Sequence, residues 1–137
     1  MKISSNSPCP CASGVKYKNC CQPYHKGIFP KTALQLMRSR YCAFALHFSD
    51  YIIKTTHQNN PDYTTNINKW KQSIEIFCQN TQFIDLKILG HTQNHNEAFV
   101  TFHAILEQNG VDVSFTEKSR FYKVANVWLY ESGEFLE

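Results

Sequence analysis

Apolar residues recur at helical spacing in the part of the chain that follows Pro30. Thr32 and Gln35 fit a capping box, and five apolar residues after it mark one buried stripe: Leu34, Met37, Tyr41, Phe44 and Phe48. Ser49 then caps a short second helix with the sequence DYIIKTTH. A third amphipathic helix is predicted over residues 66–78, with its apolar face formed by Ile67, Trp70, Ile74 and Phe77.

The pattern changes to a period of two residues after residue 80, which is typical of strands. Three strands have apolar residues on one face: Ile84, Leu86 and Ile88; then Ala98, Val100, Phe102, Ala104 and Leu106; then Val111, Val113, Phe115, Ser119 and Phe121. Asn109-Gly110 is a hairpin signal, and VWLYE forms a fourth strand after a turn at Ala125-Asn126. We therefore expect an α+β domain whose three helices cover one face of a four-stranded antiparallel sheet.

The first residues of the chain follow neither period and are rich in cysteine instead. Four of the six cysteines lie between Cys9 and Cys21, in two tight pairs. Pro23, Gly27 and Pro30 punctuate the following connector. The sequence therefore predicts a small module over residues 1–27 and a globular domain over residues 28–137.

The four clustered cysteines have the spacing of a metal site. A tetrahedral Zn²⁺ holds thiolates at about 2.3 Å, which places neighbouring sulfurs ~3.7 Å apart. The adjacent pair Cys20-Cys21 and the pair Cys9-Pro10-Cys11 can both satisfy this spacing. Lysines at 16 and 18 offset the negative charge of four bound thiolates. We expect a structural zinc ion held by Cys9, Cys11, Cys20 and Cys21, with His25 as a substitute for the fourth ligand.

The same cysteine spacing is compatible with other roles for these thiols. Disulfides, a redox or persulfide-handling thiol site, and iron in place of zinc are the alternatives. The N-terminus has no apolar run of the kind found in a signal peptide, and no stretch has the length of a membrane span. These features predict a cytoplasmic protein, and a reducing cytoplasm disfavours disulfides.

Charge is distributed unevenly along a chain whose net charge is +3. Residues 1–49 carry seven basic residues and no acidic one, whereas residues 50–137 carry seven basic and eleven acidic residues. A basic N-terminal module suits an acidic protein partner. It also permits association with RNA or the ribosome, in which Tyr17 and Tyr24 stack on bases.

Two stretches of the sequence resemble known families. The spacing Cys-Pro-Cys-x8-Cys-Cys, with Ser13-Gly14 and the ending KYKNCC, resembles the SEC-C zinc motif at the C-terminus of the SecA preprotein translocase. The last ligand of that motif is usually His, where this chain has Cys21, and Ala12 stands where Gly is common. This resemblance implies a module that binds proteins, since SecA uses its motif to meet a chaperone partner and the ribosome.

The rest of the chain is similar to the YchJ family of bacterial proteins. The similarity lies in LMRSRYCAF, DYIIKTTH, TQFIDLKIL and EKSRFYKVANVWLYESG. It implies a SEC-C motif followed by a cone-shaped domain of the nuclear-transport-factor-2-like fold, which often encloses a cavity. Many members carry a second SEC-C motif at the C-terminus, which this sequence, ending at Glu137, does not contain.

One charged residue suggests a site in such a cavity. Glu117 falls on the apolar face of its strand, where a carboxylate needs a partner. Arg38 and Arg40 flank the buried stripe of the first helix, and we expect one of them to pair with Glu117. Tyr41 and His57 are further candidates for the cavity lining, His57 as an acid or base.

Three functions follow from these features. A non-enzymatic zinc module that binds a chaperone, a translocation component or the ribosome is the first. A small-molecule binding protein or enzyme built around Glu117 is the second, and RNA association through the basic module is the third. The sequence contains no Gly-rich phosphate loop, His-Glu-x-x-His helix or nucleophile elbow.

Overall fold

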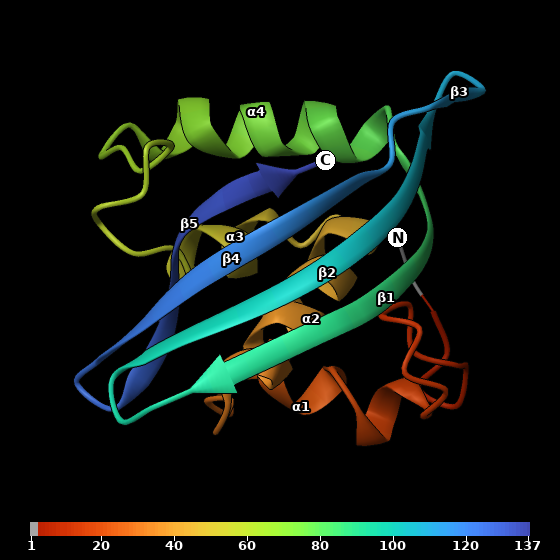
Figure 1. The fold of residues 1–137 in the computed structure, drawn as a ribbon. Coiled ribbons are helices and arrows are strands. Elements are labelled where there is room, and N and C mark those ends of the chain that lie inside the picture. Colours follow the sequence, from red (N-terminus) through yellow and green to blue (C-terminus); the bar gives the residue numbers. More distant parts are fainter. Residues whose placement is uncertain (1–2) are drawn as a thin grey trace.

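A curved antiparallel sheet and the helices packed on one of its faces make up most of the molecule (Figure 1). The computed structural model describes residues 3–137. Lys2, one of the basic residues of the N-terminal part, lies outside the described residues. The elements in chain order are η1 (Tyr17–Asn19), α1 (Gln22–His25), α2 (Ala33–Ala45), α3 (Ser49–Lys54), α4 (Ile67–Gln79), β1 (Gln82–Gln93), β2 (Glu97–Gln108), β3 (Val111–Asp112), β4 (Phe115–Val124) and β5 (Val127–Leu136).

The sheet has the strand order β1-β2-β4-β5, with the short β3 paired to β2, and all of these pairs are antiparallel. This confirms the predicted α+β class, with helices first and strands second. The alternation in β2 is confirmed at every position from Ala98 to Leu106. Asn109 and Gly110 form the predicted hairpin turn with φ values of 52° and 77°.

Two strands differ from the expected pattern because each contains an irregularity. The register of β1 against β2 shifts between Phe83 and Asp85, so Phe83 and Leu86 pack into the interior while Ile84 is 51% exposed. A bulge inserts one residue and reverses the faces on either side of it. The strand predicted from Val111 to Phe121 is divided into β3 and β4, since the residues at 113 and 114 leave the ladder.

The capping box at the start of α2 is present as predicted. The Gln35 backbone N–H donates to Thr32 Oγ1 at 3.1 Å, and the Thr32 backbone N–H donates to Gln35 Oε1 at 3.2 Å. The buried surface of α2 is wider than the predicted stripe, because Leu36, Arg40 and Cys42 are buried in addition to Met37 and Tyr41. Leu34, Phe44 and Phe48 are only partly buried, and Phe48 lies beyond the end of the helix.

The other two helices are placed near their predicted positions. α3 is shorter than expected, and Ser49 is its first residue and makes no capping hydrogen bond. The side chain of Asn66 caps α4 by accepting from the Lys69 backbone N–H at 3.2 Å. Within residues 3–137, no helix is both long and apolar enough to cross a membrane.

The N-terminal segment shares a core with the domain. Cys9, Cys11, Tyr17 and Cys21 belong to the same cluster of buried residues as Leu36 of α2 and the inward-facing residues of β2. In Figure 1 this segment and α1 lie beside α2, at the edge of the molecule farthest from α4. The module therefore packs against α2, while α4 lies at the opposite edge of the molecule.

Candidate functional site

The two cysteine pairs are brought together by a tight loop. The Cys9 backbone N–H donates to the Val15 carbonyl at 2.9 Å, and Pro8 and Lys16 form an isolated antiparallel bridge. Ala12 has a φ of 63°, in the left-handed region that glycine adopts at no steric cost. Cys20 and Cys21 lie between η1 and α1, where Cys20 has a φ of −125° and a ψ of −97° and so interrupts helical geometry.

The four sulfur atoms are close enough to share one metal ion. All four lie within 4.8 Å of one another. The Cys11 and Cys20 sulfurs are 3.5 Å apart, and the Cys20 and Cys21 sulfurs are 3.9 Å apart. These separations bracket the ~3.7 Å expected for two thiolates on a tetrahedral zinc ion. The arrangement therefore fits a metal with tetrahedral sulfur coordination.

The close approach of the four thiols also favours the binding of a cation between them. A hydrogen bond from the neighbouring Cys11 thiol lowers the pKa of Cys9, whereas donation to Cys11 raises the pKa of Cys21. Burial raises the pKa of Cys20 to about 11. The thiolate form of Cys9 is thus stabilised at the expense of Cys20 and Cys21, and a positive ion placed between the sulfurs would remove this competition.

Two residues of α2 complete the surroundings of the sulfur cluster. Arg38 Nη1 donates to the Cys11 carbonyl at 3.0 Å and lies 3.9 Å from the Cys11 sulfur. The buried Cys42 sulfur lies 3.8 Å from that of Cys9. A guanidinium at this distance offsets part of the charge of the thiolates. The sequence pattern places Arg38 beside Glu117 and does not anticipate its contact with the cysteines.

His25 connects the module to α2 through both ring nitrogens. Nε2 donates to the Ser39 carbonyl at 2.9 Å, so Nδ1 accepts from the Tyr17 hydroxyl at 2.6 Å. Burial lowers the pKa of His25, which keeps the ring in the neutral form that this pattern needs. With both nitrogens engaged, the ring is not placed as a fourth ligand. Tyr17, 5% exposed, is not available to stack on bases.

We expect the Tyr17–His25 hydrogen bond to stabilise the seating of the module on α2. Tyr17→Phe leaves the half-buried Nδ1 without a donor and should lower the free energy of unfolding by about 1–3 kcal/mol. His25→Phe removes both hydrogen bonds and should cost more. Urea denaturation of the metal-loaded protein measures both effects. Equal stability of all three proteins would show that the linkage contributes nothing.

A second candidate site is a cavity of about 630 Å³ between the sheet and the helices. Arg40, Tyr41 and Glu117 are among the residues that line it. Arg38 and His57 do not line it. Positions 38 and 40 are about 200° apart around a helix, so only one of the two arginines can face the cavity. His57 is engaged outside the cavity, where Nδ1 accepts from the Asn59 backbone N–H at 2.9 Å.

The expected ion pair between Glu117 and an arginine is not formed. Ion pairs within residues 3–137 join Lys71 to Asp50 and Arg120 to Glu97. Glu117 instead accepts hydrogen bonds from the Tyr130 hydroxyl, at 3.0 Å, and from the Ser119 hydroxyl. The guanidinium of Arg40 lies over the Tyr130 ring, 4.6 Å from its centre. The pattern of residues along the chain does not indicate that a tyrosine of the last strand lies between the two charged groups.

Two family models match separate stretches of the chain. A family model described as the SEC-C motif matches residues 6–23, and one described as the YchJ middle NTF2-like domain matches residues 32–133. A curated relative, the UPF0225 protein of Photorhabdus laumondii, is 39% identical over 130 residues, which cover 91% of this chain and 79% of the relative.

Two solved structures of SEC-C motif-containing proteins are similar over nearly the whole chain. The solution structure from Rhodopseudomonas palustris has 29% identity and a TM-score of 0.81, covering 96% of this chain and 100% of that one. The crystal structure from Psychrobacter arcticus has 31% identity and a TM-score of 0.75, covering 92% and 81%. Because the middle-domain model spans most of the sequence and the SEC-C model matches the cysteine cluster, the chain belongs to the YchJ family.

Proposed function

We propose that the cysteine cluster holds a structural zinc ion and that the module it stabilises binds an acidic protein partner. Four thiolates fill a tetrahedral zinc site and leave no position for a substrate, which is the property of structural sites. Buried Cys9, Cys11 and Cys21 enclose the ion, so its chemical contribution is to fold the loop rather than to react.

An exposed apolar pair beside the module carries the proposal. Ile28 and Phe29 are 61% and 60% exposed in the connector between α1 and α2. Exposed Lys26 and Lys31 flank them, and the module contributes exposed Lys16 and Lys18. Large apolar side chains surrounded by one sign of charge are the composition of a protein-binding surface. We call Ile28, Phe29 and these four lysines the connector surface.

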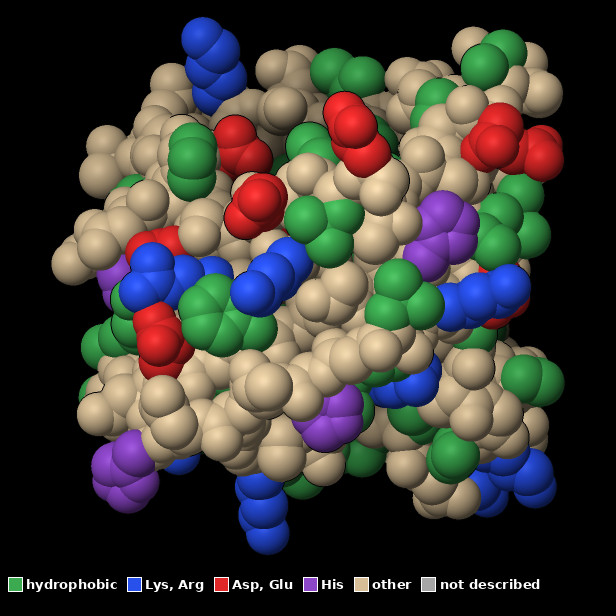
Figure 2. Space-filling view, viewed as in Figure 1, with side chains coloured by type: hydrophobic (Ala, Val, Ile, Leu, Met, Phe, Trp, Pro, Cys, Tyr) green, Lys and Arg blue, Asp and Glu red, His purple; other side chains and the backbone are tan. Residues whose placement is uncertain are grey.

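The charge of the connector surface supports an acidic partner. No acidic residue precedes Asp50 in the sequence. On the outer face of the sheet, by contrast, basic and acidic side chains are interspersed (Figure 2). A partner with acidic and apolar residues would complement the connector surface but not the sheet. The resemblance to the SecA motif directs the search to translocation chaperones and ribosomal proteins.

A binding experiment with matched surface variants tests this function. Wild-type protein and the double variant Ile28→Ser/Phe29→Ser would be used to capture partners from native cytoplasm, and each captured protein would then be purified and titrated. We expect the double variant to bind at least about tenfold more weakly, as for loss of an apolar anchor. Leu89→Ser, at a residue of β1 that is 60% exposed, is the matched control.

The charge contribution and the RNA alternative are tested in the same titration. Lys16→Glu/Lys18→Glu should slow association and reduce its dependence on salt. Binding should survive treatment with ribonuclease. If ribonuclease abolishes it, the module binds RNA, and the proposed protein partner is wrong. Equal affinity of the wild type and the connector double variant would also contradict the proposal.

A further inference from the structure

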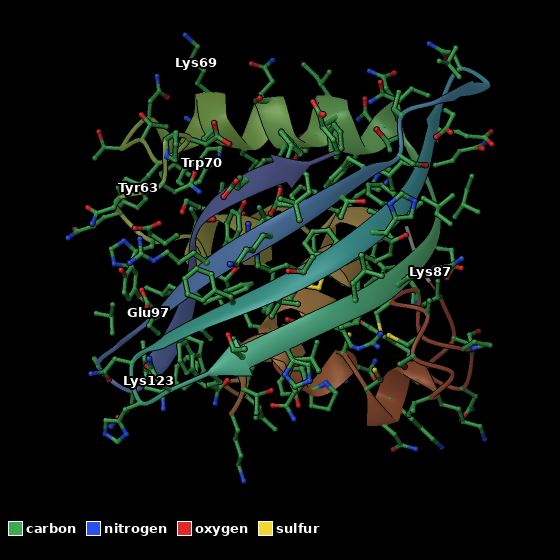
Figure 3. All side chains as sticks on the ribbon, in the orientation of Figure 1. Tyr63, Lys69, Trp70, Lys87, Glu97 and Lys123 are labelled. Atoms are coloured by element: carbon green, nitrogen blue, oxygen red, sulfur yellow. The ribbon has the colours of Figure 1, made fainter. Side chains whose placement is uncertain are left out.

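The cavity is walled by aromatic side chains and is large enough for a small molecule. Its volume of about 630 Å³ lies within the range of ligand pockets, roughly 300–1,000 Å³. The aromatic walls come from α2, α4 and three strands: Phe44, Trp70, Phe77, Phe83, Phe102 and Phe115. The exposed lining residues Asp62, Ser73 and Phe77 lie on the loop before α4 and on α4, which places the entrance there. Figure 3 shows Tyr63 and Trp70 together near the start of α4.

A carboxylate is fixed in this apolar cavity by its neighbours. Glu117 Oε2 accepts from the hydroxyls of Tyr130 and Ser119. Gly133 lies directly against the carboxylate, and a Cβ at that position would overlap Glu117 and come within 2.6 Å of the Tyr130 hydroxyl. Oε1 has no protein donor within residues 3–137. The carboxylate is therefore held in one position with one oxygen free.

A guanidinium with free donors lines the same cavity. Arg40 is 8% exposed, and its three hydrogen bonds all leave from Nη1, to the Ile52 carbonyl and to the hydroxyls of Thr55 and Thr56. Nη2 and Nε have no acceptor among the described residues. In the described part of the chain, every side-chain nitrogen or oxygen that is fully buried has a hydrogen-bond partner. These two donors and Glu117 Oε1 are therefore in contact with open space.

The two charges remain separate because Tyr130 stands between them. Its ring lies under the Arg40 guanidinium, and its hydroxyl binds the Glu117 carboxylate. A ligand with only a negative charge would be attracted by Arg40 and repelled by Glu117. A ligand with only a positive charge would be attracted by Glu117 and repelled by Arg40. A ligand that carries both an anionic acceptor and a cationic donor satisfies both groups.

We propose that the cavity binds an aromatic α-amino acid. The α-carboxylate accepts from Nη2 and Nε of Arg40, the α-ammonium donates to Oε1 of Glu117, and the side chain packs among the aromatic walls. This inference does not rest on the proposed function, because α2 directs Arg40 to the cavity and Arg38 to the cysteine cluster.

Calorimetric titration of the metal-loaded, full-length protein tests the ligand class. The probes are L-phenylalanine, L-tyrosine and L-tryptophan, with two analogues that each lack one charge, 3-phenylpropionate and 2-phenylethylamine. We expect at least one amino acid to bind in the micromolar to millimolar range and each analogue to bind at least about tenfold more weakly. If no amino acid binds, or if an analogue binds as well as its parent, the inference is wrong.

Variants assign the binding to the cavity. Glu117→Gln should lower the affinity for the amino acid at least about tenfold but leave the affinity for 3-phenylpropionate unchanged or higher. Gly133→Ala should displace the carboxylate and have a similar effect. Glu134→Gln, an exposed residue of β5, is the matched control. Unchanged amino-acid affinity in both cavity variants would contradict the assignment. The comparison of probes on the wild type stands even if a variant does not fold.

Discussion

Replacing Cys21 with serine should release the metal and unfold the N-terminal module. Cys21 is 1% exposed and supplies one of the four clustered sulfurs. A serine hydroxyl does not ionise at neutral pH and is a poorer ligand for zinc than a thiolate. Metal binding contributes roughly 10–16 kcal/mol to folding in zinc-finger peptides. Even a partial loss of this free energy should therefore destabilise the protein more than most point mutations do. This is the largest effect that we expect from any single substitution in the chain.

Metal analysis of anaerobically purified protein measures this effect directly. The wild type should contain one zinc ion per chain, and Cys21→Ser should contain none after dialysis against a chelator. Cys78→Ser is the matched control, because Cys78 is also 1% exposed but packs with the second buried cluster, among Trp70 and Ile74. That variant should keep its zinc. Zinc retained in Cys21→Ser, or lost equally in both variants, would contradict the assigned ligands.

The identity of the metal in the wild-type protein also distinguishes zinc from iron and from a cluster that binds no metal. Iron in place of zinc would leave the four ligands correct and the identity of the ion wrong. A wild type that contains no metal and whose cysteines are paired or freely alkylated would contradict the metal site altogether.

Features set by neighbouring residues were predictable from the sequence. The capping box of Thr32 and Gln35, the alternation of β2 and the turn at Asn109-Gly110 each depend on residues a few positions apart. The grouping of the four cysteines also belongs to this class, because the loop between them is short. Local geometry allows few alternatives in such segments.

Contacts between distant parts of the chain were not predictable. Arg38 reaches Cys11 across 27 positions, and Cys42 reaches Cys9 across 33. Both contacts depend on how the module rests on α2, and a periodic pattern in either segment does not contain that information. The missing Glu117–Arg pair has the same origin, because Tyr130 enters from β5 to separate the two charges.

The apolar stripe of α2 is the clearest case in which local pattern and tertiary packing disagree. Periodicity favoured Leu34 as a core residue, yet Leu36, which was not in the stripe, has no exposed surface. A helix covered by a sheet on one side and by a second packed segment on another is buried over more than one stripe. The N-terminal module supplies that second cover, since its cysteines and Tyr17 share a cluster with Leu36.

The energetic consequence is a large difference between two leucines separated by one residue. Leu36→Ala should lower the free energy of unfolding by about 2–5 kcal/mol, because it removes buried methyl groups and leaves a cavity in the cluster shared by the module and the domain. Leu34→Ala, at a partly buried position, should cost about 1 kcal/mol because less apolar area leaves water there. Both substitutions replace a leucine with an alanine in the same helix. The change in helix propensity is therefore the same in both, and it cancels when the two losses of stability are compared. Urea denaturation with saturating zinc measures both values. Equal losses, or a greater loss at Leu34, would mean that α2 presents its predicted stripe to the core and that the module does not cover it.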